Sequence, residues 1–177
     1  GTLLTEMDGQ PPLDLLEKIH EELNENDKRL VQTSLFLGIE MDPLKDNPQQ
    51  GDFLIRNIMG ADRASGGIQV GAMLREGQLV QFHLRDKDMS AEDLRLVLNR
   101  YKTEEHAKKA SGALLFSCLG RGQYLYGKPN HDSDMFRDQL GDIPLGGFFC
   151  NGEIGPVGKT TFLHGYTSSF GIFHPAH

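Results

Sequence analysis

Two segments of the chain share a pattern that could bring reactive side chains together. Residues 115–122 read LFSCLGRG and residues 148–155 read FFCNGEIG. In each segment an apolar run is followed by a cysteine, one further residue and a glycine. If both runs are strands of one sheet, Cys118 and Cys150 leave it at a shared edge. Glycine there lets backbone N–H groups approach a small ligand closely. Alternatively, both are buried strand-end cysteines, because free cysteine is among the most buried residue types.

A cysteine, a histidine and an acid could together form a thiol catalytic triad. By residue type the candidates are Cys118 or Cys150, His164 and Glu153. Residue type does not show that these side chains are adjacent, and a chain with two cysteines and seven histidines always offers such a set. Two dispersed cysteines and a histidine could also ligate a metal, but their spacing fits no zinc finger. We therefore expect neither an enzyme nor a metal site.

Residues 153–160 come close to a phosphate-binding loop. They read EIGPVGKT, whereas that loop has the pattern G-x-x-x-x-G-K-[ST] between a strand and a helix. Glu153 stands at the first glycine position and places a carboxylate where phosphate would bind. The residues that follow are β-like, so no helix N-terminus would face a phosphate. The sequence therefore predicts no nucleotide hydrolysis.

Apolar runs and alternating patterns predict the strands that would position these residues. A short strand-like segment covers residues 3–8, and about seven strands follow at 35–41, 53–59, 68–74, 79–85, 112–118, 143–150 and 161–173. In the last of these, alternation would place His164, Tyr166 and Ser168 on one face.

Hydrophobic spacing and capping residues predict about three helices. One opens at Pro11 and Pro12, one is capped by Ser90, and a short one starts at Asp132 or Ser133 and closes at Gly141. Together with consecutive strands, this predicts the α+β class, with a largely antiparallel or mixed sheet. We expect a single domain over residues 1–177, with an N-terminal helical segment at 1–34 and an α+β body at 35–177.

The distribution of charge excludes some partners. Of the 25 acidic and 18 basic residues, residues 1–50 hold eleven and four, so residues 51–177 carry fourteen of each. A body without surplus positive charge is not suited to nucleic acid or to an anionic membrane surface. Two cysteines suggest no disulfide framework, and the sequence offers neither a signal-peptide pattern nor an apolar run of membrane-spanning length. The expected location is the cytoplasm.

The same motifs resemble the C-terminal domain of FIST (F-box and intracellular signal transduction) proteins. The resemblance rests on GALLFSCLGRG at 112–122, GDIPLGGFFCNGEIGPVG at 141–158 and FLHGYTSSFGIF at 162–173, with DFLIRNIMGAD at 52–62 and LVQFHLRD at 79–86 upstream. It spans essentially the whole chain, and the order and spacing of several motifs make it specific.

The resemblance implies a cytoplasmic sensory domain that binds a small molecule, such as an amino acid or a derivative. Its partners would be the N-terminal FIST half and a downstream signalling protein. F-box relatives suggest an alternative, a protein-interaction module that recruits substrates. Some bacterial members are proposed to sense a gas through haem. The resemblance covers only the C-terminal half, so an axial ligand could lie elsewhere, and we expect no cofactor.

Seven residues occupy motif positions of the family and are the predicted ligand-binding residues: Cys118, Gly120, Arg121, Cys150, Glu153, His164 and Tyr166. From residue type, Arg121 would pair with a ligand carboxylate and Glu153 with a ligand amine. If the ligand binds between the two FIST halves, this chain would supply one wall of the pocket.

Overall fold

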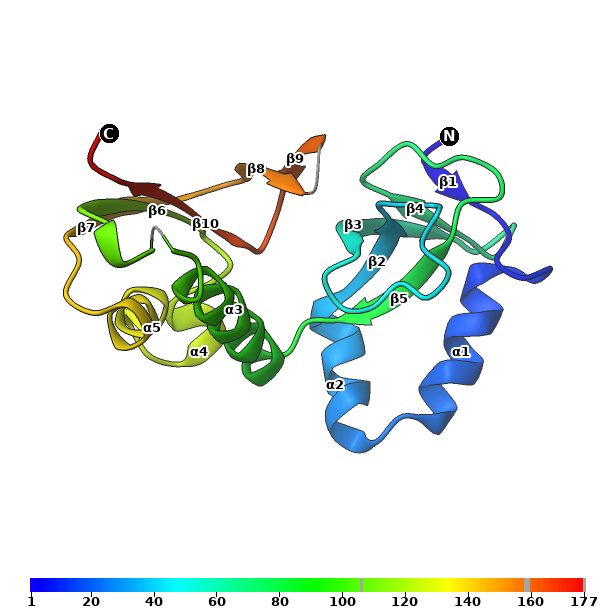
Figure 1. The fold of residues 1–177 in the computed structure, drawn as a ribbon. Helices are drawn as coiled ribbons and strands as arrows, with labels where there is room; N and C mark the ends of the chain where they lie inside the picture. The colour runs from blue at the N-terminus through cyan, green and yellow to red at the C-terminus, as the bar shows by residue number, and fades with distance from the viewer. Residues whose placement is uncertain (106, 158–159, 177) are drawn as a thin grey trace. The chain divides into compact units, whose positions relative to one another are not determined.

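The computed structural model describes residues 1–105, 107–157 and 160–176. Contacts within the chain group into two compact units, Gly1–Asp86 and Lys87–His177, which are described separately (Figure 1). The sequence predicts a single domain over residues 1–177, and this stays a prediction.

The first unit is built on a five-stranded antiparallel sheet with the strand order β1-β4-β3-β2-β5. Its elements are β1 (Leu3–Leu4), α1 (Pro12–Glu22), α2 (Glu25–Ser34), β2 (Leu35–Glu40), β3 (Phe53–Asp62), β4 (Gly67–Val70) and β5 (Val80–Leu84). Leu37 and Ile68 are almost fully buried in its core, and Leu13 of α1 packs against them. The apolar spacing of α1 thus anchors the helix to the sheet.

Helix α2 was not anticipated, and its start explains why. The side chain of Asn24 accepts hydrogen bonds from the backbone N–H groups of Asn26 and Asp27, at 2.9 and 3.0 Å. This is the bonding of a helix N-cap. The polar residues from Asn24 to Asp27 could be taken for the end of the first helix, but in the structure they begin a second one.

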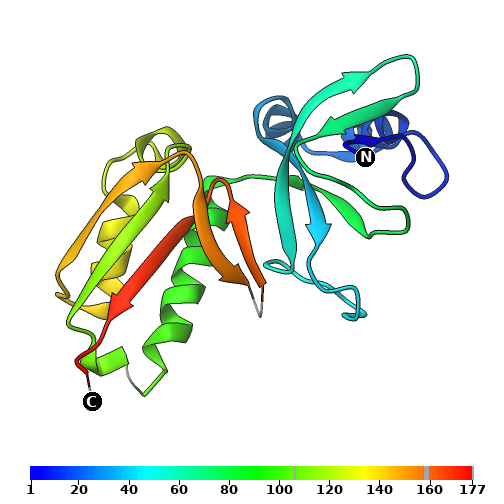
Figure 2. The same ribbon diagram turned by 90° about the horizontal axis from the view of Figure 1, so that it is seen from above.

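The second unit contains a three-stranded sheet with the order β10-β6-β7 and a separate two-stranded sheet, β8-β9 (Figure 2). Its elements are α3 (Lys87–Lys102), the 3-10 helix η1 (Ala107–Lys109), β6 (Gly112–Cys118), α4 (Gln123–Tyr126), α5 (His131–Leu140), β7 (Leu145–Cys150), β8 (Glu153–Val157), β9 (Thr160–His164) and β10 (Ser168–Phe173). Strands β6 and β7 are parallel, and α4 and α5 lie in the crossover that parallel strands require.

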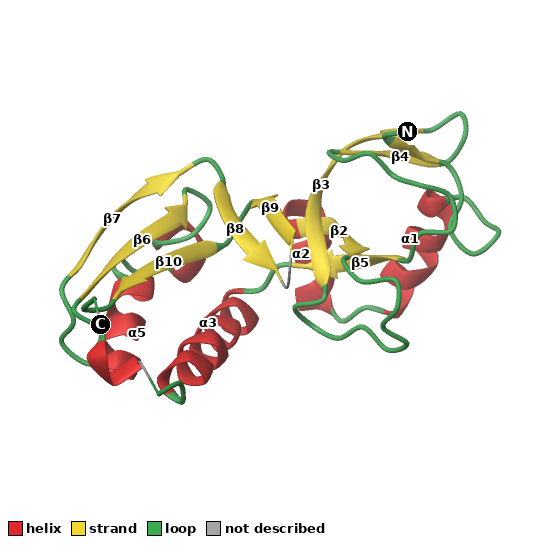
Figure 3. Ribbon diagram, turned by 45° about the horizontal axis from the view of Figure 1, so that its top comes forward, coloured by secondary structure: helices red, strands yellow, loops and turns green. Residues whose placement is uncertain are grey.

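Helices α3 and α5 lie on one side of this sheet (Figure 3). Phe136 of α5 is buried and stacks on Phe170 of β10, with ring centroids 5.4 Å apart. Leu94 and Leu98 of α3 complete the core with Ala113 of β6. Because side chains alternate along a strand, Leu115 and Ser117 lie on the same side as Ala113.

The α+β class with antiparallel and mixed sheets is confirmed, but the expected number of helices is too low. The described residues form five α-helices. Helix α3 begins at Lys87, so Ser90 lies inside its first turn and is not the N-cap. The strand expected at 161–173 is two strands, because Tyr166 adopts a positive φ of 61° between them. His164, Tyr166 and Ser168 therefore do not alternate along one strand.

None of the helices in the described part of the chain is both long enough and apolar enough to cross a membrane.

Candidate functional site

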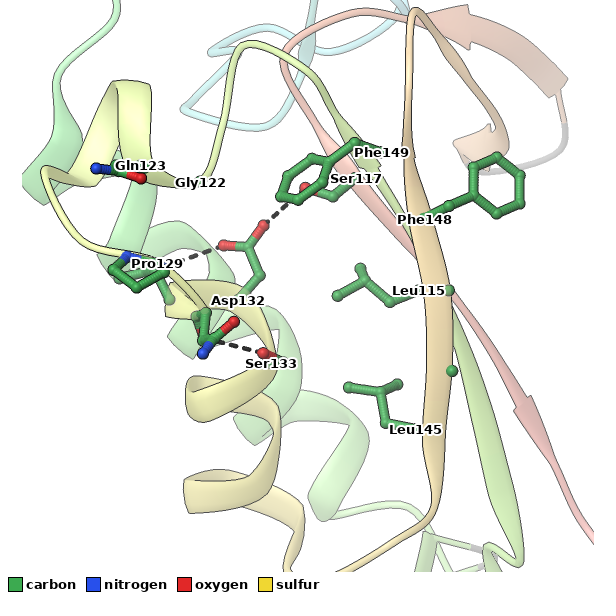
Figure 4. Close-up of a pocket in the computed structure, with 14 residues that line it drawn as sticks. Leu115, Ser117, Gly122, Gln123, Pro129, Asp132, Ser133, Leu145, Phe148 and Phe149 are labelled. Carbon is green, nitrogen blue, oxygen red and sulfur yellow. Dashed lines mark hydrogen bonds and ion pairs between the residues drawn. The ribbon is translucent and has the colours of Figure 1, made fainter.

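A pocket of about 370 Å³ lies in the second unit, between strands β6 and β7 and the start of helix α5. Small-molecule sites in proteins commonly have volumes of roughly 300–1,000 Å³. The lining residues include Leu115 and Ser117 of β6, Leu145 and Phe149 of β7, and the first residues of α5. Figure 4 shows Leu115, Leu145 and Phe149 on the side of the strands that faces α5, and Phe148 on the other side.

Two glycines allow close packing around this pocket. A Cβ atom at Gly147 would lie 1.9 Å from the carbonyl oxygen of Leu115, so any other residue would push β7 away from β6. Gly122 has a φ of 62°, and a Cβ there would meet the ring of Phe149 at 2.9 Å. Glycine at these positions lets β7 and the loop before α4 approach closely.

A buried ion pair borders the pocket. The Arg121 guanidinium donates two hydrogen bonds to Asp132, from Nε to Oδ2 at 2.8 Å and from Nη2 to Oδ1 at 3.0 Å. Each side chain is 6% exposed. Burial of Asp132 opposes its ionisation, but the hydrogen bonds and charge of Arg121 outweigh burial and lower its pKa. Asp132 is therefore a carboxylate, and the fork geometry holds the loop after β6 against the start of α5.

Three further side chains complete this network. Ser117 Oγ donates to Asp132 Oδ2 at 3.0 Å, and Arg121 Nη2 donates to the Tyr126 hydroxyl at 2.6 Å. His131 contacts Asp132 Oδ1 through Nδ1 at 3.1 Å, and its ring stacks on Tyr126 with centroids 3.5 Å apart. The network ties β6, α4 and α5 together, so the wall of the pocket is held rigidly.

The two cysteines meet at the end of the parallel strands, as their sequence pattern predicts. Cys118 and Cys150 are register partners on β6 and β7. The Cys150 thiol donates to Glu153 Oε1 at 3.4 Å, and Thr167 Oγ1 donates to Glu153 Oε2 at 2.9 Å. Glu153 is only 2% exposed.

The environment of Cys150 does not activate it as a nucleophile. Burial, followed by the hydrogen bond to Glu153, raises the pKa of its thiol. A catalytic cysteine needs the opposite shift, because the thiolate is the reactive form. His164 hydrogen-bonds through Nε2 to the carbonyl oxygen of Gly155, at 3.1 Å. These contacts give no support to a thiol triad.

Contacts in the structure connect most of the predicted site residues near the carboxyl ends of β6 and β7. Cys118, Cys150 and Glu153 gather at the strand ends, and Arg121 contacts the backbone carbonyl of Tyr166 at 3.4 Å. His164 is the register partner of Glu153 in the β8-β9 sheet, and Gly120 lies in the turn between β6 and α4. None of the seven is among the described residues that line the pocket. The guanidinium expected to bind a ligand carboxylate is engaged by Asp132. Ligand binding by the seven stays a prediction.

Sequence reasoning missed the polar residues of the pocket, which include Gln123, His131 and Ser133. Asp132 and Ser133 are noticeable in the sequence only as helix-capping residues. Ligands of open α/β sheets bind beside the carboxyl ends of parallel strands, where a crossover helix begins. That rule would have selected the start of α5, had the β6–β7 pairing been known to be parallel.

Comparison with known proteins gives matches along most of the chain. The model of the family described as the FIST C domain matches residues 12–156. Uncharacterised proteins of Mycobacterium bovis and Mycobacterium tuberculosis are each 42% identical over 173 residues, which is 98% of this chain and 45% of each relative. An F-box/LRR-repeat protein of Arabidopsis thaliana is 27% identical over 183 residues, covering 93% of this chain and 34% of that relative. The chain thus spans less than half the length of these curated relatives.

Proposed function

The chain belongs to the FIST C domain family, and on this basis we propose that it is a sensory domain of a signal-transduction protein that binds a small molecule. The observation that carries the proposal is the pocket of about 370 Å³ between β6, β7 and α5. The β6 and β7 side of the pocket contributes Leu115, Leu145 and Phe149, and the α5 side contributes polar residues such as His131 and Ser133. Apolar surface combined with polar groups is typical of small-molecule sites.

The buried network around Asp132 supports a binding role. Arg121, Ser117 and His131 all contact this carboxylate, so the pocket wall is fixed before a ligand arrives. A preformed site loses little conformational entropy on binding. The raised pKa of the Cys150 thiol also favours binding over catalysis. We further propose that the domain acts in the cytoplasm, together with an N-terminal FIST half and a downstream signalling partner.

A thermal-shift screen tests this proposal, with amino acids and their derivatives as the first compounds. A ligand at one hundred times its Kd stabilises a protein by about 2.7 kcal/mol. For a chain of this size, that corresponds to a rise in Tm of roughly 5–10 °C.

A variant that fills the pocket locates the binding. Ser133→Phe adds a ring to the lining of the pocket, whereas Asp138→Phe adds the same ring to an exposed position of α5 outside that lining. We expect the shift to disappear in the first variant and to persist in the second. If no compound shifts Tm, or if both variants respond like the wild type, the pocket is not the ligand site.

A second candidate function, protein interaction, is favoured by the other face of the three-stranded sheet. Leu114, Phe148 and Phe173 are 39, 62 and 54% exposed. The register places Leu114 on the opposite side of the sheet from Ala113 and Leu115. Exposed apolar patches often mark contact surfaces. This alternative predicts that Phe173→Ser, at a position outside the lining of the pocket, abolishes binding of a protein partner and leaves the ligand-induced shift in Tm unchanged.

A further inference from the structure

The two cysteines of the chain lie side by side on neighbouring strands. Cys118 and Cys150 are register partners at the ends of the parallel strands β6 and β7. Neighbouring strands are about 4.8 Å apart, and the Cα atoms of disulfide-bonded cysteines are about 4.4–6.8 Å apart. Because side chains alternate along a strand, both cysteines lie on the face of the sheet that carries Leu114 and Phe148. The backbone therefore holds the pair at a separation that a disulfide can span.

The contacts of Cys150 agree with this placement. Its sulfur lies 3.6 Å from the carbonyl oxygen of Ser117, the residue before Cys118, so it lies close to the backbone of β6. Burial and the hydrogen bond to Glu153 are the main causes that raise the pKa of the Cys150 thiol, and the charge of Cys118 adds to them. Charges interact in this way at short range. Both thiols are free in the structure.

From this geometry we propose that Cys118 and Cys150 form a reversible redox pair, which a small-molecule disulfide such as oxidised glutathione converts into a disulfide bond. The sulfur of Cys150 attacks the small disulfide, whose S–S bond breaks, and one thiol leaves while a mixed disulfide forms at Cys150. The sulfur of Cys118 then attacks the Cys150 sulfur and releases the second thiol. The two cysteines are oxidised, the small disulfide is reduced, and the two departing thiols take up the two protons that the cysteines give up.

The exposure of the two side chains determines the order of these steps. Cys118 is only 7% exposed, whereas Cys150 is partly exposed, so Cys150 meets the small disulfide first. A reducing thiol reaches the bond from the same side, which makes the reaction reversible. Because the pKa of the Cys150 thiol is raised, its thiolate is scarce at neutral pH, and the reaction should become faster as pH rises.

The disulfide would change the hydrogen bonding of a buried carboxylate. The Cys150 thiol donates to Glu153 Oε1 and Thr167 donates to Oε2, and oxidation removes the first of these donors. Glu153 is 2% exposed, so the lost donor changes the environment of the start of β8. In NMR spectra the amide signals of Glu153 and Thr167 should therefore shift on oxidation.

Intact mass spectrometry of the folded chain in glutathione redox buffers, at mildly alkaline pH, tests the proposal. The chain contains two cysteines, so a monomer that loses the mass of two hydrogen atoms must carry the bond between Cys118 and Cys150. We expect this species to form and dithiothreitol to reverse it. The same titration in urea is the reference, because an unfolded chain must close a long loop. The equilibrium constant for the folded chain should be at least about tenfold larger.

Single variants distinguish the two positions, and neither can form the internal bond. We expect Cys118→Ala to accumulate a mixed disulfide with glutathione at Cys150. Cys150→Ala retains the buried cysteine and should react at least about tenfold more slowly. If either variant does not fold, the titration of the unmodified chain still decides the proposal.

Three results would overturn the proposal. The first is a folded chain that stays a dithiol, or gains only glutathione or intermolecular disulfides, in buffers that oxidise the chain in urea. The second is an equilibrium constant for the folded chain no larger than that in urea. The third is a Cys150→Ala variant that folds and reacts as fast as Cys118→Ala, which would contradict entry through Cys150. None of them bears on the proposed ligand site, because neither cysteine is among the described residues that line the pocket.

Discussion

The buried pair of Arg121 and Asp132 gives the sharpest prediction about stability. Asp132→Asn removes the negative charge but keeps the size of the side chain. Arg121 would remain buried without the carboxylate that accepts its hydrogen bonds, and among the acids only the charge of Asp93 would still act on it. Breaking a buried ion pair in this way typically costs about 3–5 kcal/mol. We therefore expect Asp132→Asn to lower the free energy of unfolding of the second unit by about this amount.

The double variant Arg121→Met/Asp132→Leu separates the two possible reasons for such a loss. If the cost comes from an unpaired buried charge, replacing both partners by apolar residues should restore most of the stability. If the two substitutions instead destabilise additively, the pair does not act as a unit.

Urea unfolding followed by tyrosine fluorescence measures this quantity in the relevant unit. The chain has no tryptophan, and its four tyrosines all lie beyond Asp86, so the signal reports on the second unit. A loss below about 1 kcal/mol for Asp132→Asn, the size of an exposed pair, would refute the reasoning.

The pH dependence gives an independent check of the same pair. The pKa of Asp132 is lower in the folded chain than its usual value, so the pair contributes stability above the unfolded pKa of about 3.9. That contribution should be lost as pH falls below this value, through the folded pKa. Asp132→Asn should lack this acid-dependent part of the stability.

Two further predictions concern the strand ends and the floor of the pocket. Because the pKa of its thiol is raised, Cys150 should react with iodoacetamide at pH 7 more slowly than a cysteine in an unfolded peptide, and Glu153→Gln should speed the reaction. Peptide mapping by mass spectrometry measures this rate. Rapid alkylation of Cys150 in the folded wild type would contradict the prediction. Gly147→Ala should destabilise the second unit by about 1–3 kcal/mol, because its Cβ would meet the Leu115 carbonyl, whereas Gly171→Ala, with open space around its Cβ, should change stability by less than about 1 kcal/mol. If urea unfolding shows that the two alanine variants lose the same free energy of unfolding, the close approach of β6 and β7 at Gly147 does not contribute to stability.

The sequence predicted the parts of the fold that depend on local pattern. The continuous apolar run at 112–118 coincides with β6, and the repeated cysteine pattern correctly placed Cys118 and Cys150 at one sheet edge. Helix α2 was missed because its sequence is polar and its cap resembles a break. The four-residue helix α4 lies in a glycine-bearing loop, where no hydrophobic period is long enough to detect.

The pocket depends on contacts between residues distant in sequence, and these were not predictable. Arg121 looked like a free cation for a ligand, but its partner Asp132 lies eleven residues further along the chain. Nothing local distinguishes Asp132 from the neighbouring acid Asp134, which lies on the exposed side of α5. Only the crossover between β6 and β7 decides which of the two is turned inward.

The most direct test of the proposed ligand site is a ¹H–¹⁵N NMR titration of the chain with phenylalaninamide. The account predicts saturable shifts at the amides of β6, β7 and the start of α5, centred on Ser117, His131 and Phe149. Saturable shifts confined to the first unit, or to the strand-end residues Cys150 and Glu153, would place the ligand elsewhere and contradict the account.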